Sequence, residues 1–173
     1  MTDEYAMIAV KAGDLDKAAV LYERYKKPLF NFFLYHRYDR DQAGDAVQQV
    51  FYRLLRYRES FKTDAVFRTW LYCIARNSMR DQFRNFVPVD ALEAAHLVAD
   101  EQNDEAHHQQ QTVRRALDSL TEDHREVLIL SRYEEMKYDQ IAEILGCSVA
   151  AVKVRVHRAI HKLREAYFQI ADQ

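Results

Sequence analysis

The stretch from Tyr138 to Ala159, YDQIAEILGCSVAAVKVRVHRA, decides the fold of the C-terminal part of the chain. Its first half is amphipathic at helical spacing, and its apolar face carries a small residue, Ala142, as is required where two helices cross at close range. Gly146 can adopt the left-handed backbone conformation that the turn requires, and Ser148 can cap the N-terminus of a second helix. The stretch therefore predicts a helix-turn-helix.

The second helix of this motif has two unlike faces. Its apolar residues recur at intervals that predict one buried stripe, which comprises Val149, Val152, Val156, Ala159, Ile160 and Leu163. The opposite surface carries Lys153, Val154, His157, Arg158 and His161, flanked by Arg155, Lys162 and Arg164. No acidic residue occurs from Lys153 through Arg164, so this face suits a DNA major groove and its phosphates. A helical hairpin with a solvated basic face is the alternative.

Composition extends the helical prediction to the whole chain. With 173 residues, of which 49% are hydrophobic and 30% charged, the chain can fold as one domain or as two small ones. Three Gly and two Pro are too few for the many turns of a β-sandwich or barrel. Apolar runs stay shorter than the roughly eighteen residues that span a bilayer, and the opening MTDEYAMIAV lacks the pattern of a signal peptide. We therefore expect a soluble, cytoplasmic, all-α protein without membrane insertion.

The charge of the chain is distributed unevenly, although its formal net value is only −2. Residues 52–84 form a basic block, in which the basic side chains are Arg53, Arg56, Arg58, Lys62, Arg68, Arg76, Arg80 and Arg84. Residues 86–111 contain neither Lys nor Arg, and their acidic side chains are Asp90, Glu93, Asp100, Glu101, Asp104 and Glu105. This acidic stretch has weak apolar periodicity, which is typical of a linker, although a short docking helix around 92–98 is an alternative for part of it.

Apolar spacing predicts helices on both sides of this linker. A break or the fresh first turn of a helix is expected at Pro28, and Asp39 and Asp41 mark a new helix start. The expected helices before the helix-turn-helix cover about 15–25, 29–35, 42–57, 67–84, 113–120 and 121–133. The predicted organisation is two small helical domains joined by a flexible acidic linker, with the boundaries 1–86, 87–111 and 112–173.

Three segments carry a resemblance to a known family. They are DAVQQVF at 45–51 with the preceding Asp41, FRTWLYCIARNSMRDQFR at 67–84, and the helix-turn-helix at 138–163. In order and spacing they resemble the sigma factors of bacterial RNA polymerase, specifically the small extracytoplasmic-function (ECF) type that contains only regions two and four. The resemblance covers nearly the whole chain. It implies that residues 1–86 are region two and residues 112–173 are region four. It further implies that the chain binds the beta-prime and beta subunits of core RNA polymerase, directs the enzyme to promoter DNA, and pairs with an anti-sigma factor.

The resemblance also implies roles for single residues. Polymerase binding is implied for Asp45, Gln48, Gln49, Arg53 and Leu55. Contact with the minus-ten element is implied for Lys62, Thr63, Phe67, Arg68, Arg76, Asn77, Arg80 and Arg84, with Asn77 the best candidate for a base contact. Contact with the minus-thirty-five element is implied for Arg132, Tyr138, Ser148, Lys153, Val154, Arg155, His157 and Arg158. Gln49 and Gly44 stand where the family often has acidic residues, so docking is expected without a salt bridge there.

Other functions remain as alternatives on the residues alone. A ligand-responsive helix-turn-helix regulator would share the DNA-binding motif and bind duplex operator unaided. For the basic helix at 67–84, the alternative is an ordinary solvated basic surface without a binding role, with Phe61, Phe67 and Trp70 in the core.

The cysteines and histidines give little support for an enzyme. Cys73 and Cys147 lie far apart without metal-spaced neighbours, so we expect reduced core cysteines. The histidines at 96, 107 and 108 could bind a metal, but no HExxH, P-loop or nucleophile pattern accompanies them. We expect no enzymatic activity, cofactor or metal.

Overall fold

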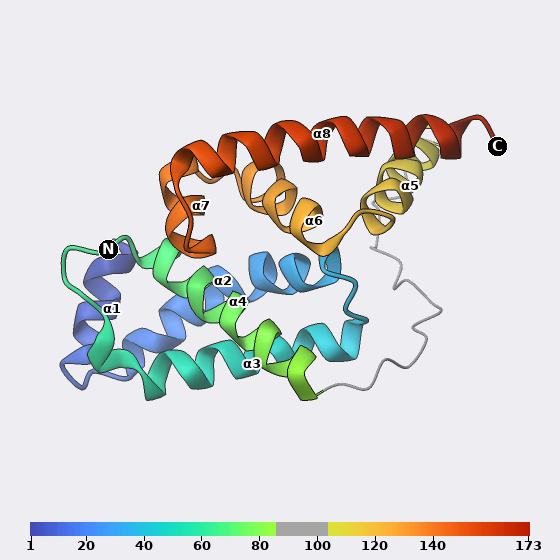
Figure 1. Cartoon of the computed structure of the whole chain (residues 1–173). Coiled ribbons are helices and arrows are strands. Elements are labelled where there is room, and N and C mark those ends of the chain that lie inside the picture. The colour runs from blue at the N-terminus through green and yellow to red at the C-terminus, as the bar shows by residue number, and fades with distance from the viewer. Residues whose placement is uncertain (86–103) are drawn as a thin grey trace. The chain divides into compact units, whose positions relative to one another are not determined.

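The computed structural model describes residues 1–85 and 104–173 (Figure 1). All regular secondary structure in these two ranges is helical, which confirms the predicted all-α class. The elements are α1 (Asp3–Lys11), α2 (Asp16–Tyr35), α3 (Arg40–Arg56), η1 (Arg58–Ser60), α4 (Phe67–Asn85), α5 (Asp104–Asp118), α6 (Glu122–Leu128), η2 (Ile129–Tyr133), α7 (Tyr138–Leu145) and α8 (Val149–Ala171). Helices α1 to α4 form one compact unit and α5 to α8 a second, and each is described by itself. Within the described ranges, no helix is long and apolar enough to cross a membrane.

The core of the first unit lies among α2, α3 and α4. Its most deeply buried apolar side chains recur three or four residues apart on each helix and include Leu21, Leu29, Phe32, Val50, Leu54, Leu71 and Ala75. Aromatic edges join the helices: the ring centroids of Tyr22 and Phe51 lie 5.1 Å apart, as do those of Phe32 and Tyr72. These contacts join α2 to α3 and to α4.

Pro28 lies inside α2, which runs without a break from Asp16 to Tyr35. The predicted break at this residue is therefore wrong. A proline in a helix interior removes one backbone hydrogen bond and crowds the preceding turn. Leu21, Leu29 and Phe32 lie on either side of it along one buried face, so their burial offsets this cost.

The predicted start of α3 at Asp39 is confirmed by a reciprocal cap. The Asp39 side chain accepts a hydrogen bond from the backbone N–H of Gln42 at 2.7 Å, and the Gln42 side chain accepts one from the N–H of Asp39 at 3.0 Å. This capping box satisfies two backbone donors that the first turn leaves without helical partners.

Helix α1 is an element that the sequence analysis did not predict. Thr2 caps it by accepting a hydrogen bond from the N–H of Tyr5 at 3.2 Å, and Ala6, Met7 and Val10 are fully buried. The cap residue and the apolar spacing are both visible in the sequence, but the helix is only nine residues long, which gives a short periodic pattern. Helix α1 packs against η1 and α4.

In the second unit, α5, α6 and α7 all pack against the long helix α8. The buried Arg125 of α6 donates to the carbonyl oxygens of Leu117 at 3.3 Å, Asp118 at 3.1 Å and Leu120 at 2.7 Å. One guanidinium therefore satisfies the carbonyl groups at the end of α5 and in the turn that follows. Burial lowers the pKa of Arg125 from its ordinary value.

Helix α5 begins earlier than the sequence predicts. It starts at Asp104 instead of near 113, so the last part of the predicted linker is helical. Residues 105–111 are exposed and lack large apolar side chains, which leaves no buried stripe to detect. Ala, Glu and Gln nevertheless favour helix. The alternative docking helix at 92–98 lies outside the described residues.

The helix predicted over 121–133 changes character midway. Regular α6 passes at Ile129 into the π-helical turn η2, where the N–H of Glu134 bonds to the carbonyl of Ile129 at 2.9 Å.

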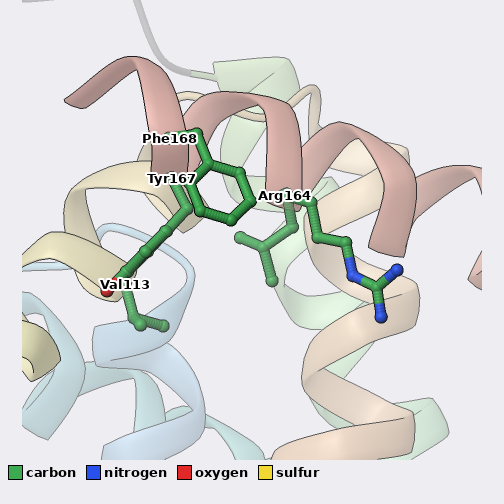
Figure 2. A pocket seen from close by; sticks show the side chains of 5 residues that line it. Val113, Arg164, Tyr167 and Phe168 are labelled. Carbon is green, nitrogen blue, oxygen red and sulfur yellow. The ribbon is translucent and has the colours of Figure 1, made fainter. Parts of the chain in front are cut away.

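Between α5 and α8, Figure 2 shows a hollow lined by Val113, Leu163, Arg164, Tyr167 and Phe168. This lining is mainly aliphatic and aromatic, so it offers no carboxylate–histidine pair or activated nucleophile for catalysis.

Candidate nucleic-acid and protein interfaces

The structure confirms the predicted turn between α7 and α8. Gly146 has a φ of 67° and a ψ of 37°, and its backbone N–H bonds to the carbonyl of Ala142. The N–H of Cys147 also bonds to that carbonyl, at 3.0 Å. Ser148 then caps α8 by accepting a hydrogen bond from the N–H of Ala151 at 3.1 Å. Local chemistry thus fixes where the second helix begins.

The apolar stripe of α8 is buried only in its middle. Val152, Val156 and Ala159 are nearly or fully inaccessible, whereas Ile160 and Leu163 are half-buried. Val149 is 38% exposed, so its predicted place in the buried stripe is wrong. It is the first residue of α8.

The opposite face of α8 is exposed and basic. Lys153, His157 and Arg158 are all exposed, and Val154 is 48% exposed among them. These residues occupy the i, i+1, i+4 and i+5 positions of the helix, so they share one surface. Arg155 is exposed beside them. The arrangement presents cationic donors together with one apolar side chain that can contact a thymine methyl group.

Further along α8, an acidic partner reduces the charge of the basic surface. The two carboxylate oxygens of Glu165 lie 3.2 Å from Nε2 of His161 and from Nζ of Lys162. Because these pairs are exposed, they add little to stability, but they balance charge locally. Residues 153–158 and Arg164 lie outside these two pairs.

Arg132 and Tyr138, which the resemblance places near the DNA backbone, lie at the other end of the motif. Arg132 is exposed in η2, and Tyr138 is half-buried in the first turn of α7. Both precede the turn at Gly146.

The residues predicted to contact the minus-ten element divide by exposure. Lys62 and Thr63 are exposed in the loop before α4, and Asn77 and Arg80 are exposed on the helix. Arg68 and Arg76 are half-buried, and the guanidinium of Arg68 lies 5.7 Å from the ring centroid of Tyr72. The side chain of Arg84 lies outside the part that the structure describes. Exposed and half-buried cations thus follow the length of α4.

Phe67 cannot contact DNA in this structure, because its side chain is fully buried. It packs in an aromatic cluster: ring centroids lie 6.2 Å apart for Phe61 and Phe67, and 5.1 Å apart for Phe61 and Trp70. The implied direct role of Phe67 is therefore corrected to a role in the core. Trp70 remains half-buried.

The outer face of α3 carries both charged and uncharged polar side chains. Asp45 and Gln48 are exposed, while Gln49 and Leu55 are half-buried. Arg53 has a partner inside the unit, because its Nη1 lies 2.7 Å from Oδ2 of Asp81 on α4. This ion pair joins α3 to α4, a connection that spacing along the sequence does not reveal.

Tyr52 is a surface residue to which sequence reasoning assigned no role. Its side chain is 58% exposed and follows Asp45 and Gln48 at spacings of seven and four residues along the outer face of α3. An exposed tyrosine between polar groups is typical of protein interfaces, where its ring supplies contact area at low entropic cost. The signal available in the sequence was its position on the polar side of an amphipathic helix.

The cysteines and histidines form no recognisable metal site among the described residues. Cys73 and Cys147 are not joined in a disulfide and are of intermediate burial, so they are less buried than core cysteines. His107 and His108 are exposed on α5, and a ring nitrogen of His107 lies 2.7 Å from the amide nitrogen of Gln111. His96 lies outside the described residues.

Two family models match the chain. Sigma-70 region 2 matches residues 21–85, and sigma-70 region 4 matches residues 110–163. The residues of the first match include α3 and α4, and those of the second include the helix-turn-helix. Helix α1 lies before both.

Solved structures share this fold. CnrH, in a structure of its complex with the cytosolic domain of CnrY, superimposes with a TM-score of 0.76 at 26% identity, covering 99% of both chains. The sigma factor RpoE of Bartonella quintana, in complex with the anti-sigma factor NepR, gives a TM-score of 0.68 at 25% identity, covering 86% of this chain and 94% of that one.

Sequence relatives extend over nearly the whole chain. RNA polymerase sigma factor YlaC of Bacillus subtilis strain 168 is 30% identical over 158 residues, covering 87% of this chain and 91% of the relative. The ECF RNA polymerase sigma-E factor of Escherichia coli strain K12 is 31% identical over 175 residues, covering 92% and 91%. With both region models matched in order, these relatives show that the chain belongs to the sigma-70 family, as an RNA polymerase sigma factor of the ECF type with regions 2 and 4.

Proposed function

We propose that this chain binds core RNA polymerase and directs it to a specific class of promoters, without being an enzyme itself. The observation that carries the proposal is the presence, on one chain, of an exposed recognition face on α8 and a polar docking face on α3. A DNA-binding module needs only the first of these surfaces. The proposed action takes place in the cytoplasm, where the polymerase transcribes.

The energetic cost of promoter opening explains why the polymerase is needed. Opening about ten base pairs costs on the order of 14 kcal/mol, at about 1.4 kcal/mol for each stacked step. Contacts to duplex DNA by one recognition helix cannot supply that energy, because they do not favour the open over the closed state. In the proposed mechanism, the second unit holds the duplex, the first unit captures extruded bases, and the polymerase supplies a large basic channel.

The proposed division of labour follows the boundaries expected from the sequence. Residues 1–86 serve as region 2, which docks on the polymerase and recognises the minus-ten element, and residues 112–173 serve as region 4. Residues 87–111 connect them. The described part of that connection, from Asp104, is helical, so it would act as a stiff spacer there.

For the minus-thirty-five element, we assign base contacts to the exposed face of α8. Arg158 and Lys153 carry donors suited to guanine edges or phosphates, and Val154 and His157 lie between them. The Ser148 hydroxyl accepts from Ala151 in the cap, and it can still donate to a phosphate. Arg132, Tyr138 and Arg155 would contact the backbone.

For the minus-ten element, we assign base capture to the loop before α4 and to the exposed side of that helix. Lys62 and Thr63 would contact the extruded strand, and Asn77 would contact a base, because an amide both donates and accepts. Arg80 is exposed and would bind phosphates, together with Arg68, Arg76 and Arg84.

For the polymerase, we assign Asp45 and Gln48 as exposed contacts, with Gln49 and Leu55 beside them. Tyr52 is added as an aromatic anchor because of its exposure on the same face. Arg53 is already paired with Asp81, so its contribution would be to hold α3 against α4. The beta-prime and beta subunits are the proposed partners.

An anti-sigma factor is a further proposed partner. The support is that CnrH is bound to CnrY and that RpoE of Bartonella quintana is bound to the anti-sigma factor NepR in the solved structures. Binding of such a protein would compete with the polymerase for exposed surfaces.

Run-off transcription tests the proposed function. Purified core polymerase is incubated with candidate promoter fragments, with and without the chain. Specific starts only in its presence are expected. A ligand-responsive regulator would instead bind duplex operator unaided and give no new start with core polymerase, which would refute the proposal.

A further inference from the structure

Two charged side chains of α1 hold the two ends of the loop that precedes α4. Lys11 donates from Nζ to the carbonyl oxygen of Phe61 at 2.8 Å, and Glu4 accepts at Oε1 from the backbone N–H of Phe67 at 3.2 Å. Both bonds are part-buried and charge-assisted, a class stronger than neutral hydrogen bonds.

The loop between these two bonds is anchored at its ends and exposed in its middle. Phe61 and Phe67 are both fully buried, whereas Lys62 and Thr63 are exposed. Within the loop, the N–H of Ala65 bonds to the carbonyl of Lys62 at 3.0 Å, which makes a turn. The buried ends fix the position of the loop, and the polar bonds fix the direction of its main chain.

Glu4 also supplies what the first turn of α4 lacks. The residue before Phe67 is Val66, whose aliphatic side chain cannot accept a hydrogen bond from the helix N-terminus. The carboxylate of Glu4, from a different helix, accepts instead from the N–H of Phe67, the first residue of α4. Negative charge is favourable at this end of the helix because of the helix dipole.

Helix α1 is itself fixed to the unit from its first turn. Asp3 accepts hydrogen bonds at 2.6 Å from Nη1 of Arg24 and from the hydroxyl of Tyr25, both on α2. The apolar side of α1 is buried through Met7 and Val10. A firmly held helix can therefore transmit its position to the loop.

We propose that α1 acts as a brace for the loop between Phe61 and Phe67. Glu4 and Lys11 are then positioning residues for the capture of extruded minus-ten bases by that loop. This inference rests on the proposed function of the loop. It adds a helix that lies before the matched region 2 model, which begins at residue 21. Neither side chain touches DNA in this proposal. Their effect is to restrict the orientations of Lys62 and Thr63, so that a correct base gains more than an incorrect one.

The test uses holoenzyme made from core polymerase and the full chain. The probe is a single-stranded non-template oligonucleotide that spans the minus-ten element of a promoter mapped by run-off transcription. A series of oligonucleotides changes one minus-ten base at a time. The measured quantity is the ratio of the dissociation constants for changed and cognate strands.

We expect Lys11→Met and Glu4→Leu to lower this ratio about three- to tenfold at one or two positions, since each removes one charge-assisted bond. Lys11→Arg and Glu4→Gln retain a donor or an acceptor, so they should restore most of the discrimination. Lys27→Met, an exposed substitution on α2, is the matched control and should leave the ratio unchanged. Core affinity and binding of a minus-thirty-five duplex should be the same in all variants.

A merely structural role predicts a different outcome. If a variant binds every strand more weakly by the same factor, the ratio of dissociation constants is unchanged and the proposed brace is refuted. The proposal is also refuted if variants that are folded by circular dichroism bind all strands as the wild type does. Equal losses in Lys11→Met and Lys11→Arg also count against it. If the wild-type holoenzyme gives no specific start and binds all strands alike, the proposed function itself fails. If the wild type discriminates and the variants discriminate equally, only the brace fails.

Discussion

The hydroxyl of Tyr25 donates a hydrogen bond to Oδ2 of Asp3 at 2.6 Å, which joins the first turn of α1 to the middle of α2. Tyr25 is almost fully buried, and its ring packs edge-on against Phe67 at a centroid distance of 5.4 Å. One side chain therefore contacts both the helix before the family match and the first residue of α4. Burial and, after it, the hydrogen bond to Asp3 raise the pKa of Tyr25 above its ordinary value.

Replacement of Tyr25 by Phe tests this link. The ring and its packing remain, but Asp3 loses one donor, so we expect the free energy of unfolding to fall by about 1 to 3 kcal/mol. Arg24 still donates to Asp3, which favours the lower end of this range. Chemical denaturation at neutral pH measures the change. An unfolding free energy equal to that of the wild type would show that the hydrogen bond contributes nothing.

The same pair predicts a pH dependence. Because the folded pKa of Tyr25 is raised, its stabilising effect is fully present below the unfolded value of about 10. Above that pH the unfolded chain loses the proton first, so the stability advantage over Tyr25→Phe declines as the pH rises. Denaturation of both proteins from pH 8 upward, as far as they stay folded, measures the difference. A constant difference above pH 10 would contradict the assignment.

Two glycines offer a matched test of backbone conformation. Gly146 has a positive φ of 67°, so Gly146→Ala should destabilise the second unit by about 1 kcal/mol through strain in the left-handed region. Gly44 lies inside α3, and an added Cβ there meets nothing within 4 Å. Gly44→Ala should therefore stabilise the first unit by about 0.5 to 1 kcal/mol. The melting temperature should fall for Gly146→Ala and rise for Gly44→Ala. Shifts of the same sign and size would refute the conformational explanation.

Variants of Arg158 and Lys153 test whether the proposed minus-thirty-five face contacts a base, a phosphate or both. If Arg158 contacts a base edge, Arg158→Ala should weaken binding to the cognate minus-thirty-five duplex by about 1 to 3 kcal/mol and relax specificity at one position. If Lys153 contacts a phosphate, Lys153→Ala should weaken all duplexes alike and lower the salt dependence. Fluorescence anisotropy of promoter fragments with holoenzyme measures both effects. Unchanged binding by folded Arg158→Ala would refute its assignment.

Substitutions on the proposed docking face of α3 are expected to weaken polymerase binding. Asp45→Arg with Gln48→Arg should lower affinity for core polymerase, because two large cations replace an exposed acidic and an exposed neutral group. Tyr52→Ala alone should cost about 1 to 2 kcal/mol if the ring is buried by the partner. Glu23→Arg, an exposed charge reversal on α2, is the control. Pull-down with core polymerase compares the binding of the variants and the control. Undiminished binding by the double variant would rule out this face as the polymerase-docking surface.

The helices and the recognition motif could largely be predicted because they depend on residues close together in the chain. The cap at Ser148, the turn at Gly146 and the apolar spacing of α8 each involve residues within one or two turns of a helix. The family, too, could be identified from segments whose order and spacing are properties of the sequence. Pro28 was misjudged because its local penalty is offset by packing that the sequence does not display.

The sequence by itself thus determined the all-α class, the helix-turn-helix and the basic character of α8. Only the tertiary structure decided that Phe67 belongs to the core and that Arg53 is paired with Asp81. It also placed Lys11 against Phe61 and Glu4 against Phe67, which lie 50 and 63 residues apart along the chain. Helical periodicity relates residues three or four positions apart, whereas contacts over such separations depend on how whole helices pack.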